Sequence, residues 1–394
     1  MGISSMPFLV GDAFLVFGFL FTLFLFLLRG KALNPLIMVY SAVYLLLFVG
    51  HVFFFEKFEL FIFVAFFIRI FYAYFTIKLI GARVGEVFIK IMTFFSTTSI
   101  IIYFLLLVVP GFESFLVDTL APPFYRITLQ QDYKHILIYT VNFRGGLFLR
   151  NPGPFWEAGG FAVFLNLALM LNLIRKGKLW NMQNSLFMVN ILTTQSTGGY
   201  VTLIALLVTF VWVKQQKIIA LAMVAILLLS VYYVSTVLPF LGEKINEHIE
   251  FVSGANTDFL PRTRFVSALE DYKTFLESPF IGKGRFLHGT ADNFNNKTLE
   301  YRNNGTSNYF AVFGLAGVLF FFGMMTYSFR LYCQRSNFST QFAYFLIVVM
   351  LVMGFSQQLF YKPFFMGFSF MFVVALKGVQ RPITRSKPVL GDTQ

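Results

Sequence analysis

The sequence has little charge, one cysteine and few histidines. Lys, Arg, Asp and Glu make up only 12% of its 394 residues, the single cysteine is Cys333, and there are 4 histidines. One cysteine excludes an intramolecular disulfide and a thiolate metal cluster. The sequence also lacks a carboxylate–histidine cluster at metal-ligand spacing, a glycine-rich phosphate loop before a helix, and a serine nucleophile elbow. We therefore expect no metal and no cofactor.

Apolar residues take the place of the missing charge. They make up 57% of the chain, which contains 56 phenylalanines, and they form continuous runs. A membrane-spanning helix needs about 20 apolar residues, whereas barrel strands would alternate apolar with polar residues. Only helices and closed barrels satisfy their backbone in lipid. The sequence predicts an all-α polytopic membrane protein, with residues 1–394 forming a single integral membrane domain.

Eleven apolar segments are candidate membrane spans. The first has no basic leader and no small-residue cleavage site, so we interpret it as a span and expect no signal peptide. The segments lie at about 8–28, 35–55, 60–80, 87–109, 157–174, 185–197, 199–213, 218–240, 308–329, 340–360 and 363–378.

Basic residues occupy alternate connectors between these spans and the carboxyl-terminal tail. These segments contain only two acidic residues, Glu86 and Asp392. The positive-inside rule places such connectors in the cytoplasm. We therefore expect a multi-pass protein of the cell (inner) membrane, with an external amino terminus, long external loops at about 110–156 and 241–307, and a cytoplasmic tail at about 379–394. The basic residues are Arg29, Lys31, Lys78, Arg83, Lys90, Arg175, Lys176, Lys178, Lys214, Lys217, Arg330, Arg335, Lys377, Arg381, Arg385 and Lys387.

The second external loop contains a predicted amphipathic helix over 262–277. Its apolar residues repeat at intervals of three or four, which is the helical period, and Ser278-Pro279 ends it. Such a helix lies on the membrane surface or covers a cavity. The repeating residues are Phe265, Leu269, Tyr272 and Leu276.

The stretch Arg150–Phe161, at the end of the first external loop, brings polar side chains to the start of a span. Pro152 and Pro154 prevent a regular helix. Glu157 follows where the chain enters the membrane. A carboxylate at that depth is costly unless it is paired or hydrated, so it indicates a lined cavity.

Arginines are the main candidates for binding an anionic substrate. Their planar forks match phosphate oxygens, so several convergent arginines form a diphosphate clamp. The alternative is that they are solvated loop charges or partners of nearby acids. The external arginines are Arg126, Arg144, Arg150, Arg262, Arg264, Arg285 and Arg302.

Glu157 and His288 are the candidate general bases. Glu157 could instead form a structural pair with an arginine, and His288 could be an ordinary exposed loop residue. Trp156 is a candidate sugar-stacking face, although aromatic residues also form belts at membrane interfaces. Arg69 lies within a predicted span, where a charge indicates either a ligand site or an ion pair, and Asp12 is the nearest acid by depth.

Four motifs in order resemble the O-antigen polymerase and ligase-like superfamily. The first, Arg150…Phe155-Trp-Glu-Ala-Gly-Gly-Phe161, is similar to an Arg…Phe-Trp-Glu-Pro-Gly signature. The others are Leu192-Thr-Thr-Gln-Ser-Thr-Gly-Gly-Tyr200, Arg264…Ser278-Pro-Phe-Ile-Gly-Lys-Gly284 and Asn308-Tyr-Phe…Phe313-Gly-Leu-Ala-Gly317.

The resemblance implies a metal-independent membrane glycosyltransferase that uses a polyprenyl-diphosphate-linked oligosaccharide in membrane lipid. It implies catalytic roles for Glu157 or His288 with Arg150 and Arg264, and a chain-length regulator and a flippase as partners, with no nucleic acid. The remaining candidates for binding diphosphate or sugar are Arg144, Arg262, Arg285, Trp156, Asn308 and Arg69.

The sequence favours a polymerase of O-antigen, capsule or exopolysaccharide repeat units. Related ligases have a histidine directly before the asparagine that matches Asn308, and here that residue is Ser307. The alternatives are a ligase that transfers the glycan to another acceptor and, from a different class, a lipid-linked glycan flippase or solute transporter. Transporters often show paired repeats, which this chain lacks.

Overall fold

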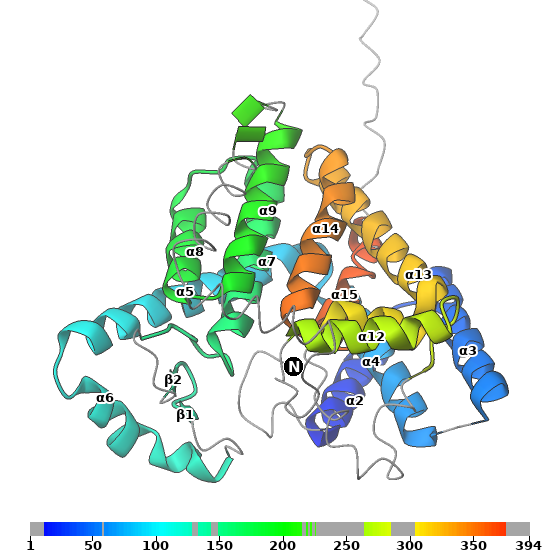
Figure 1. Cartoon of the computed structure of the whole chain (residues 1–394), viewed down its shortest axis with the longest axis horizontal. Helices are drawn as coiled ribbons and strands as arrows, with labels where there is room; N and C mark the ends of the chain where they lie inside the picture. Colours follow the sequence, from blue (N-terminus) through cyan, green and yellow to red (C-terminus); the bar gives the residue numbers. More distant parts are fainter. Residues whose placement is uncertain are drawn as a thin grey trace, which may run out of the picture.

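Helices dominate the structure, a computed structural model that describes residues 12–56, 59–127, 133–142, 149–214, 218–219, 221–222, 225, 264–284 and 304–375 (Figure 1). The strands in this part of the chain are β1 (Tyr133–His135) and β2 (Thr140–Asn142), which form an antiparallel hairpin. The all-α prediction is confirmed.

In the part of the chain that the structure describes, four helical segments are long and apolar enough to cross a membrane, by length and composition. They are α3 (Pro35–Phe55), α4 with α5 (Leu60–Ile80 and Val84–Val108, joined by the 3₁₀ turn Gly81–Arg83), α7 (Ala158–Lys176) and α13 (Gly305–Arg335). Shorter apolar helices are α2 (Asp12–Leu28), α9 (Thr197–Val213) and α14 (Gln341–Ser356). The chain is therefore a polytopic membrane protein, as predicted, and the number of eleven spans stays a prediction.

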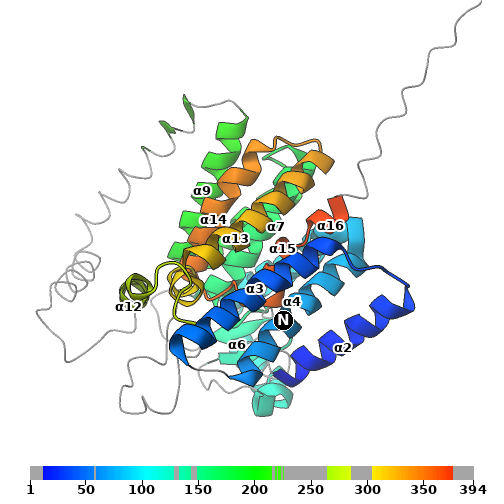
Figure 2. The ribbon, with the colours of Figure 1, turned by 90° about the vertical axis from the view of Figure 1, so that its right-hand side faces the viewer.

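α7 is the central helix. All its residues from Ala158 to Ile174 are buried, which explains why its sequence is apolar on every side. α5, α8 (Met182–Thr193) and α9 pack against it, and α14 lies between α9 and α13 (Figures 1 and 2). Glu157 caps the amino end of this helix and Arg175 lies in its last turn, so α7 places both residues at the boundaries of the core.

The predicted span at 363–378 differs from the structure. The chain there forms two short helices, α15 (Pro363–Phe368) and α16 (Phe372–Ala375), separated by a turn within the core. The Ser328 hydroxyl of α13 donates to the Ser369 carbonyl at 2.7 Å and accepts from the Phe372 N–H at 3.3 Å. A neighbouring helix thus satisfies backbone groups at the break, which lets an irregular segment lie among membrane helices. The predicted span at 218–240 falls almost wholly outside the described residues.

α12 (Arg264–Glu277) runs across the bundle (Figure 1) and is seen end-on in Figure 2. Its apolar residues Phe265, Tyr272 and Leu276 are exposed, whereas Ser267 and Asp271 are buried against the protein. Of the two placements predicted for this helix, an exposed apolar stripe favours the membrane surface.

The segment after α12 is joined to a break in α13. Gly314 has a non-helical conformation inside α13 (φ 59°), and four backbone hydrogen bonds of 2.8–3.0 Å connect residues 279–284 with residues 311–316. A Cβ at Gly282 (φ +71°) would lie 2.4 Å from the carbonyl of Val312. Glycine is required at this contact, which fixes the end of α12 and with it the position of that helix.

The first predicted external loop has a small core of its own. Three short helical turns, α6 (Phe112–Ser114), η2 (Phe115–Leu120) and η3 (Pro122–Ile127), precede the hairpin. The apolar core contains Leu116, Ala121, Ile136, Tyr139 and Val141.

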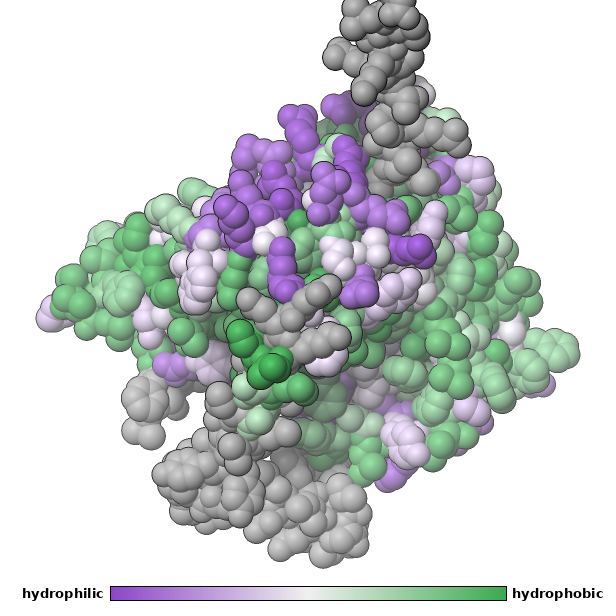
Figure 3. All heavy atoms as spheres, turned by 90° about the horizontal axis from the view of Figure 1, so that it is seen from above, coloured by the Kyte–Doolittle hydropathy of each residue, from purple (hydrophilic) through white to green (hydrophobic). Residues whose placement is uncertain are grey.

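The two ends of the bundle collect residues from different connectors. At the end that is uppermost in Figure 1, Figure 3 shows hydrophilic side chains gathered, with hydrophobic ones around them. Connectors predicted to be cytoplasmic contact each other: the Lys31 ammonium donates to the Lys78 carbonyl at 2.7 Å, and Arg175 lies 3.8 Å from Glu86. Residues of the two predicted external loops meet at the amino end of α7.

Candidate active site at the amino end of α7

Asn151 anchors the loop that leads to α7. Its side chain is buried, accepts from the Ser99 hydroxyl of α5 at 2.5 Å and donates to the Thr193 hydroxyl of α8 at 2.9 Å. Gly153 (φ +53°) lies under the Phe161 ring, where a Cβ would come within 2.8 Å of the ring carbons. The hydrogen bonds of Asn151 and the close packing of Gly153 hold this loop in one non-helical conformation before α7 begins.

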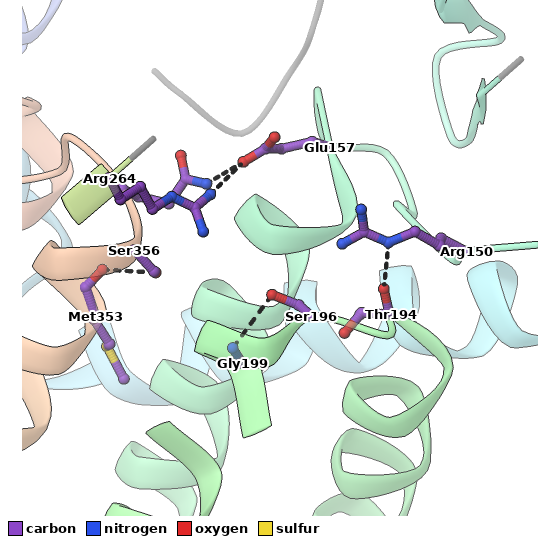
Figure 4. Close-up of polar contacts among 9 residues, drawn as sticks. Arg150, Glu157, Thr194, Ser196, Gly199, Arg264, Met353 and Ser356 are labelled. Carbon is purple, nitrogen blue, oxygen red and sulfur yellow. Dashed lines mark hydrogen bonds and ion pairs between the residues drawn. The ribbon is translucent and has the colours of Figure 1, made fainter. Parts of the chain in front are cut away.

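Glu157 is turned away from its own helix. Its backbone is extended at the amino cap of α7, and its carboxylate forms no capping bond. Instead it accepts a hydrogen bond from the Gln357 amide and lies 3.7 Å from the Arg264 guanidinium (Figure 4). A Cβ at Gly159 would lie 3.2 Å from the carboxylate, so the small residue gives the carboxylate room. The pair joins the start of the span predicted at 157–174 to the second predicted external loop.

Arg150 approaches from the other side in Figure 4. It is exposed, and its Nε donates to the Thr194 carbonyl at 3.2 Å. The turn that contains Thr194 and Ser196 lies beside Glu157, because the Ser196 hydroxyl would be 3.5 Å from a Cβ at Gly159. Arg264 therefore contacts the Glu157 carboxylate and Arg150 is bonded to the turn beside it, and both guanidinium groups retain unused donors for an anion.

Lys362 is a further cation at this site, beside Trp156 and Glu157. It lies between α14 and α15, and its ammonium is 4.1 Å from the centroid of the Trp156 ring, a cation–π contact. Loss of hydration lowers the pKa of Lys362 to about 8, and the charge of Glu157 opposes this shift. The Trp156 indole also packs on Gly160, where a Cβ would lie 2.8 Å from the ring. The ring face predicted to stack on a sugar is thus covered by Lys362.

Asn308 binds a carboxylate instead of facing the group around Glu157. The buried Asp271 of α12 accepts from the Ser307 hydroxyl at 2.7 Å and from the Asn308 amide at 3.5 Å. Asn304 caps α13 and donates to the carbonyl of Arg264 at 3.5 Å. These bonds hold the first residue of α12 next to the start of α13, so they position the Arg264 side chain.

Residues 184–322 match the family model described as O-antigen ligase. The matched region covers about a third of the chain, which is similar to the O-antigen ligase family over that stretch. This agrees with the O-antigen polymerase and ligase-like superfamily that the motifs resemble, and it assigns the protein an O-antigen ligase- or polymerase-type function. The family is that of membrane glycosyltransferase-like enzymes acting on lipid-linked oligosaccharides. A comparison with curated proteins gives no match.

The region that matches the O-antigen ligase model begins in α8 and ends in α13, so it includes Arg264 and Asn308 but not Glu157 or Arg150. The structure brings Arg150, Trp156, Glu157 and Arg264 together. Their assignment to a substrate stays a prediction. Arg144, Arg262, Arg285, His288 and Arg302 lie outside the described residues, as does the side chain of Arg126.

Arg69 lies within α4 and is half-buried. The side chain of its predicted partner, Asp12, falls outside the described part, so that pairing stays a prediction. Among the residues that the structure describes, no three His, Cys, Asp or Glu side chains come together as a metal site would require.

Three polar residues in or beside the site, Gln357, Asp271 and Lys362, are not among the candidates that the sequence predicts. The signal for Lys362 was its place in the short connector between the spans predicted at 340–360 and 363–378. That connector falls on the external side, where the positive-inside rule gives no reason for a lysine.

Proposed function

We propose that the protein is a polymerase that joins polyprenyl-diphosphate-linked oligosaccharide repeat units into a surface polysaccharide on the outer face of the cytoplasmic membrane. One observation carries the proposal. At the amino end of the most buried helix, Arg264 of the second predicted external loop lies 3.7 Å from Glu157, and Arg150 of the first is bonded to the Thr194 carbonyl in the turn beside it. The match to the O-antigen ligase family supports the same substrate class.

In this proposal the two arginines bind the diphosphate of the donor. Guanidinium groups form charge-assisted hydrogen bonds with phosphate oxygens. Such bonds strengthen as the bond between the anomeric carbon and the phosphate oxygen breaks, because the departing polyprenyl diphosphate gains negative charge. The diphosphate is a built-in leaving group, so the reaction needs no nucleotide sugar.

Glu157 is the proposed general base. It takes the proton of the acceptor hydroxyl while that oxygen attacks the anomeric carbon. Gln357 donates to one carboxylate oxygen and Arg264 lies beside the same oxygen, which orients the group. The contact with Arg264 equally supports a purely structural pair, in which case His288 is the candidate base.

A ligase is the second candidate, since the matching family is described as O-antigen ligase. The residue at the position of the ligase histidine favours the polymerase. Ser307 donates its hydroxyl proton to Asp271 at 2.7 Å. A hydroxyl held in this way does not supply the basic nitrogen that the resemblance implies for a ligase.

The test is the reaction itself. Purified protein in detergent or lipid, given only the lipid-diphosphate repeat unit, should produce a ladder of lengthened lipid-linked glycans and release polyprenyl diphosphate, with chelator present. Product on a different lipid or on a protein, without a ladder, would identify a ligase. Movement of the intact lipid-linked unit across the membrane without a new glycosidic bond would identify a flippase and contradict the enzyme proposal.

A further inference from the structure

Lys362 is a cation that no described carboxylate neutralises directly. Among the described residues, no carboxylate oxygen lies within 4.0 Å of its ammonium, and the carboxylate whose charge acts on it, Glu157, is already bonded by Gln357 and Arg264. An ammonium has three N–H donors. The contact that holds it is with the Trp156 ring at 4.1 Å, which takes none of these donors as a conventional hydrogen bond.

The fold holds Lys362 in place through its backbone position and through its contact with Trp156. Lys362 is half-buried at the cap of α15, directly before Pro363, and its side chain lies over an indole that is itself packed on Gly160 of α7. A lysine that loses hydration raises the free energy of the folded state unless an ion pair or hydrogen bonds replace the lost water contacts. A structural ion pair would do so, but none is formed in the described part of the chain.

We propose that Lys362 is a third cation for the diphosphate, held over Trp156 so that its ammonium meets a phosphate oxygen that the two arginines leave free. The identity of the lipid-linked donor rests on the proposed function. Charge complementarity supports the assignment, since Glu157 is the carboxylate that contacts Arg264 and acts on Lys362, while Arg150 adds a further positive charge at the neighbouring turn. The excess positive charge matches a diphosphate, which has negative charge on each phosphate.

Lys362 differs from the arginines because it titrates. Arginine stays protonated at every relevant pH, whereas the pKa of Lys362 is lowered to about 8. Glu157 is the charged group that acts on it, and its carboxylate raises that pKa. Binding through Lys362 should therefore be complete near neutral pH and decline as pH rises through about 8, and phosphate at the site should move the decline upward.

The experiment measures binding of farnesyl diphosphate to the purified full-length protein from about pH 6.5 to 9.5. The variants are Lys362→Met, Lys362→Arg and the control Lys273→Met, an exposed lysine of α12 that pairs with Glu270 at 3.2 Å. Loss of a charge-assisted bond typically costs about 1.5–3 kcal/mol, so Lys362→Met should weaken binding roughly ten- to hundredfold. Lys362→Arg should retain binding and abolish the decline above about pH 8. The Lys273→Met control should match the wild type.

Wild-type binding in Lys362→Met, or an unchanged alkaline decline in Lys362→Arg, would overturn the assignment. Because Lys362→Arg keeps the charge, it decides the question even if the methionine variant does not fold. Lys362-dependent binding in a protein that makes no glycan ladder would support this inference and contradict the polymerase. A ladder with binding that is indifferent to Lys362 would contradict the inference alone.

Discussion

The two ends of α7 carry two arginine–glutamate pairs that look alike and are surrounded differently. Arg264 lies 3.7 Å from Glu157 at the amino end, and Arg175 lies 3.8 Å from Glu86 at the carboxyl end. The side-chain exposures are also similar, 39% and 33% in the first pair and 31% and 35% in the second. Partly exposed pairs of this kind contribute only about 0–1 kcal/mol to stability. Distance and exposure alone therefore do not separate a functional pair from a structural one.

The surroundings separate them. Glu86 has its second partner on its own helix, Lys90, at 3.0 Å and one turn away. The partners of Glu157 come from remote parts of the chain, because Arg264 begins α12 and Gln357 follows α14. A local pair forms wherever a helix places opposite charges four residues apart. The Glu157 carboxylate is contacted by residues from several distant elements. This arrangement does not arise from local helix geometry, and we infer that the carboxylate serves the proposed reaction.

The prediction with the largest effect concerns the side of the membrane that each end of α7 faces. If this prediction is wrong, the comparison between the two ends no longer supports the proposed site. Reporter fusions at Lys178, Lys217 and Gln394 should read cytoplasmic, and fusions near Tyr133 and Asn296 should read external, because basic connectors stay inside. Each reading is all-or-none. An external carboxyl terminus would place the Arg175 end of α7 outside and overturn the position of the proposed site.

The second prediction compares the two carboxylates. Glu157→Gln keeps the shape but cannot accept a proton, and loss of a general base typically costs about 100- to 10,000-fold in rate. Glu86→Gln, the matched change at the other end of α7, should leave the rate near that of the wild type. Glycan ladder formation by both purified variants, with membrane insertion checked, measures the difference. A mild effect at Glu157 together with a severe one for His288→Ala would transfer the base to the histidine.

The third prediction compares the two arginines and has the smallest effect. Arg264→Lys keeps the charge and loses the planar fork. We expect turnover to fall about ten- to hundredfold, the cost of a charge-assisted bond, with an effect of the same kind for Arg150→Lys. Arg175→Lys should change turnover by no more than about twofold, since a lysine can serve an exposed pair as well. Equal tolerance of lysine at Arg150, Arg264 and Arg175 would contradict a bidentate diphosphate clamp.

Much of the fold could be predicted because membrane helices are determined locally. A continuous apolar run must form a helix in lipid to satisfy its own backbone, so the helices α3, α4, α5, α7, α13 and α14 fall close to the predicted spans. The loop from Arg150 to Trp156 was also predicted, since proline and glycine act on their own backbone. The break between α15 and α16 was not, because the group that satisfies it, Ser328, lies on another helix.

The sequence by itself determined the membrane class, the main helices and the motif that contains Arg150 and Glu157, and the two external loops stay a prediction. Only the tertiary structure decided which partners meet the Glu157 carboxylate. Gln357 is 200 residues away in sequence, and no periodic pattern connects residues so far apart. It also decided which side of α12 is buried, because Asp271 binds Ser307 of α13 and the apolar residues of α12 are left exposed. The contact between Lys362 and the Trp156 ring also exists only in the tertiary structure.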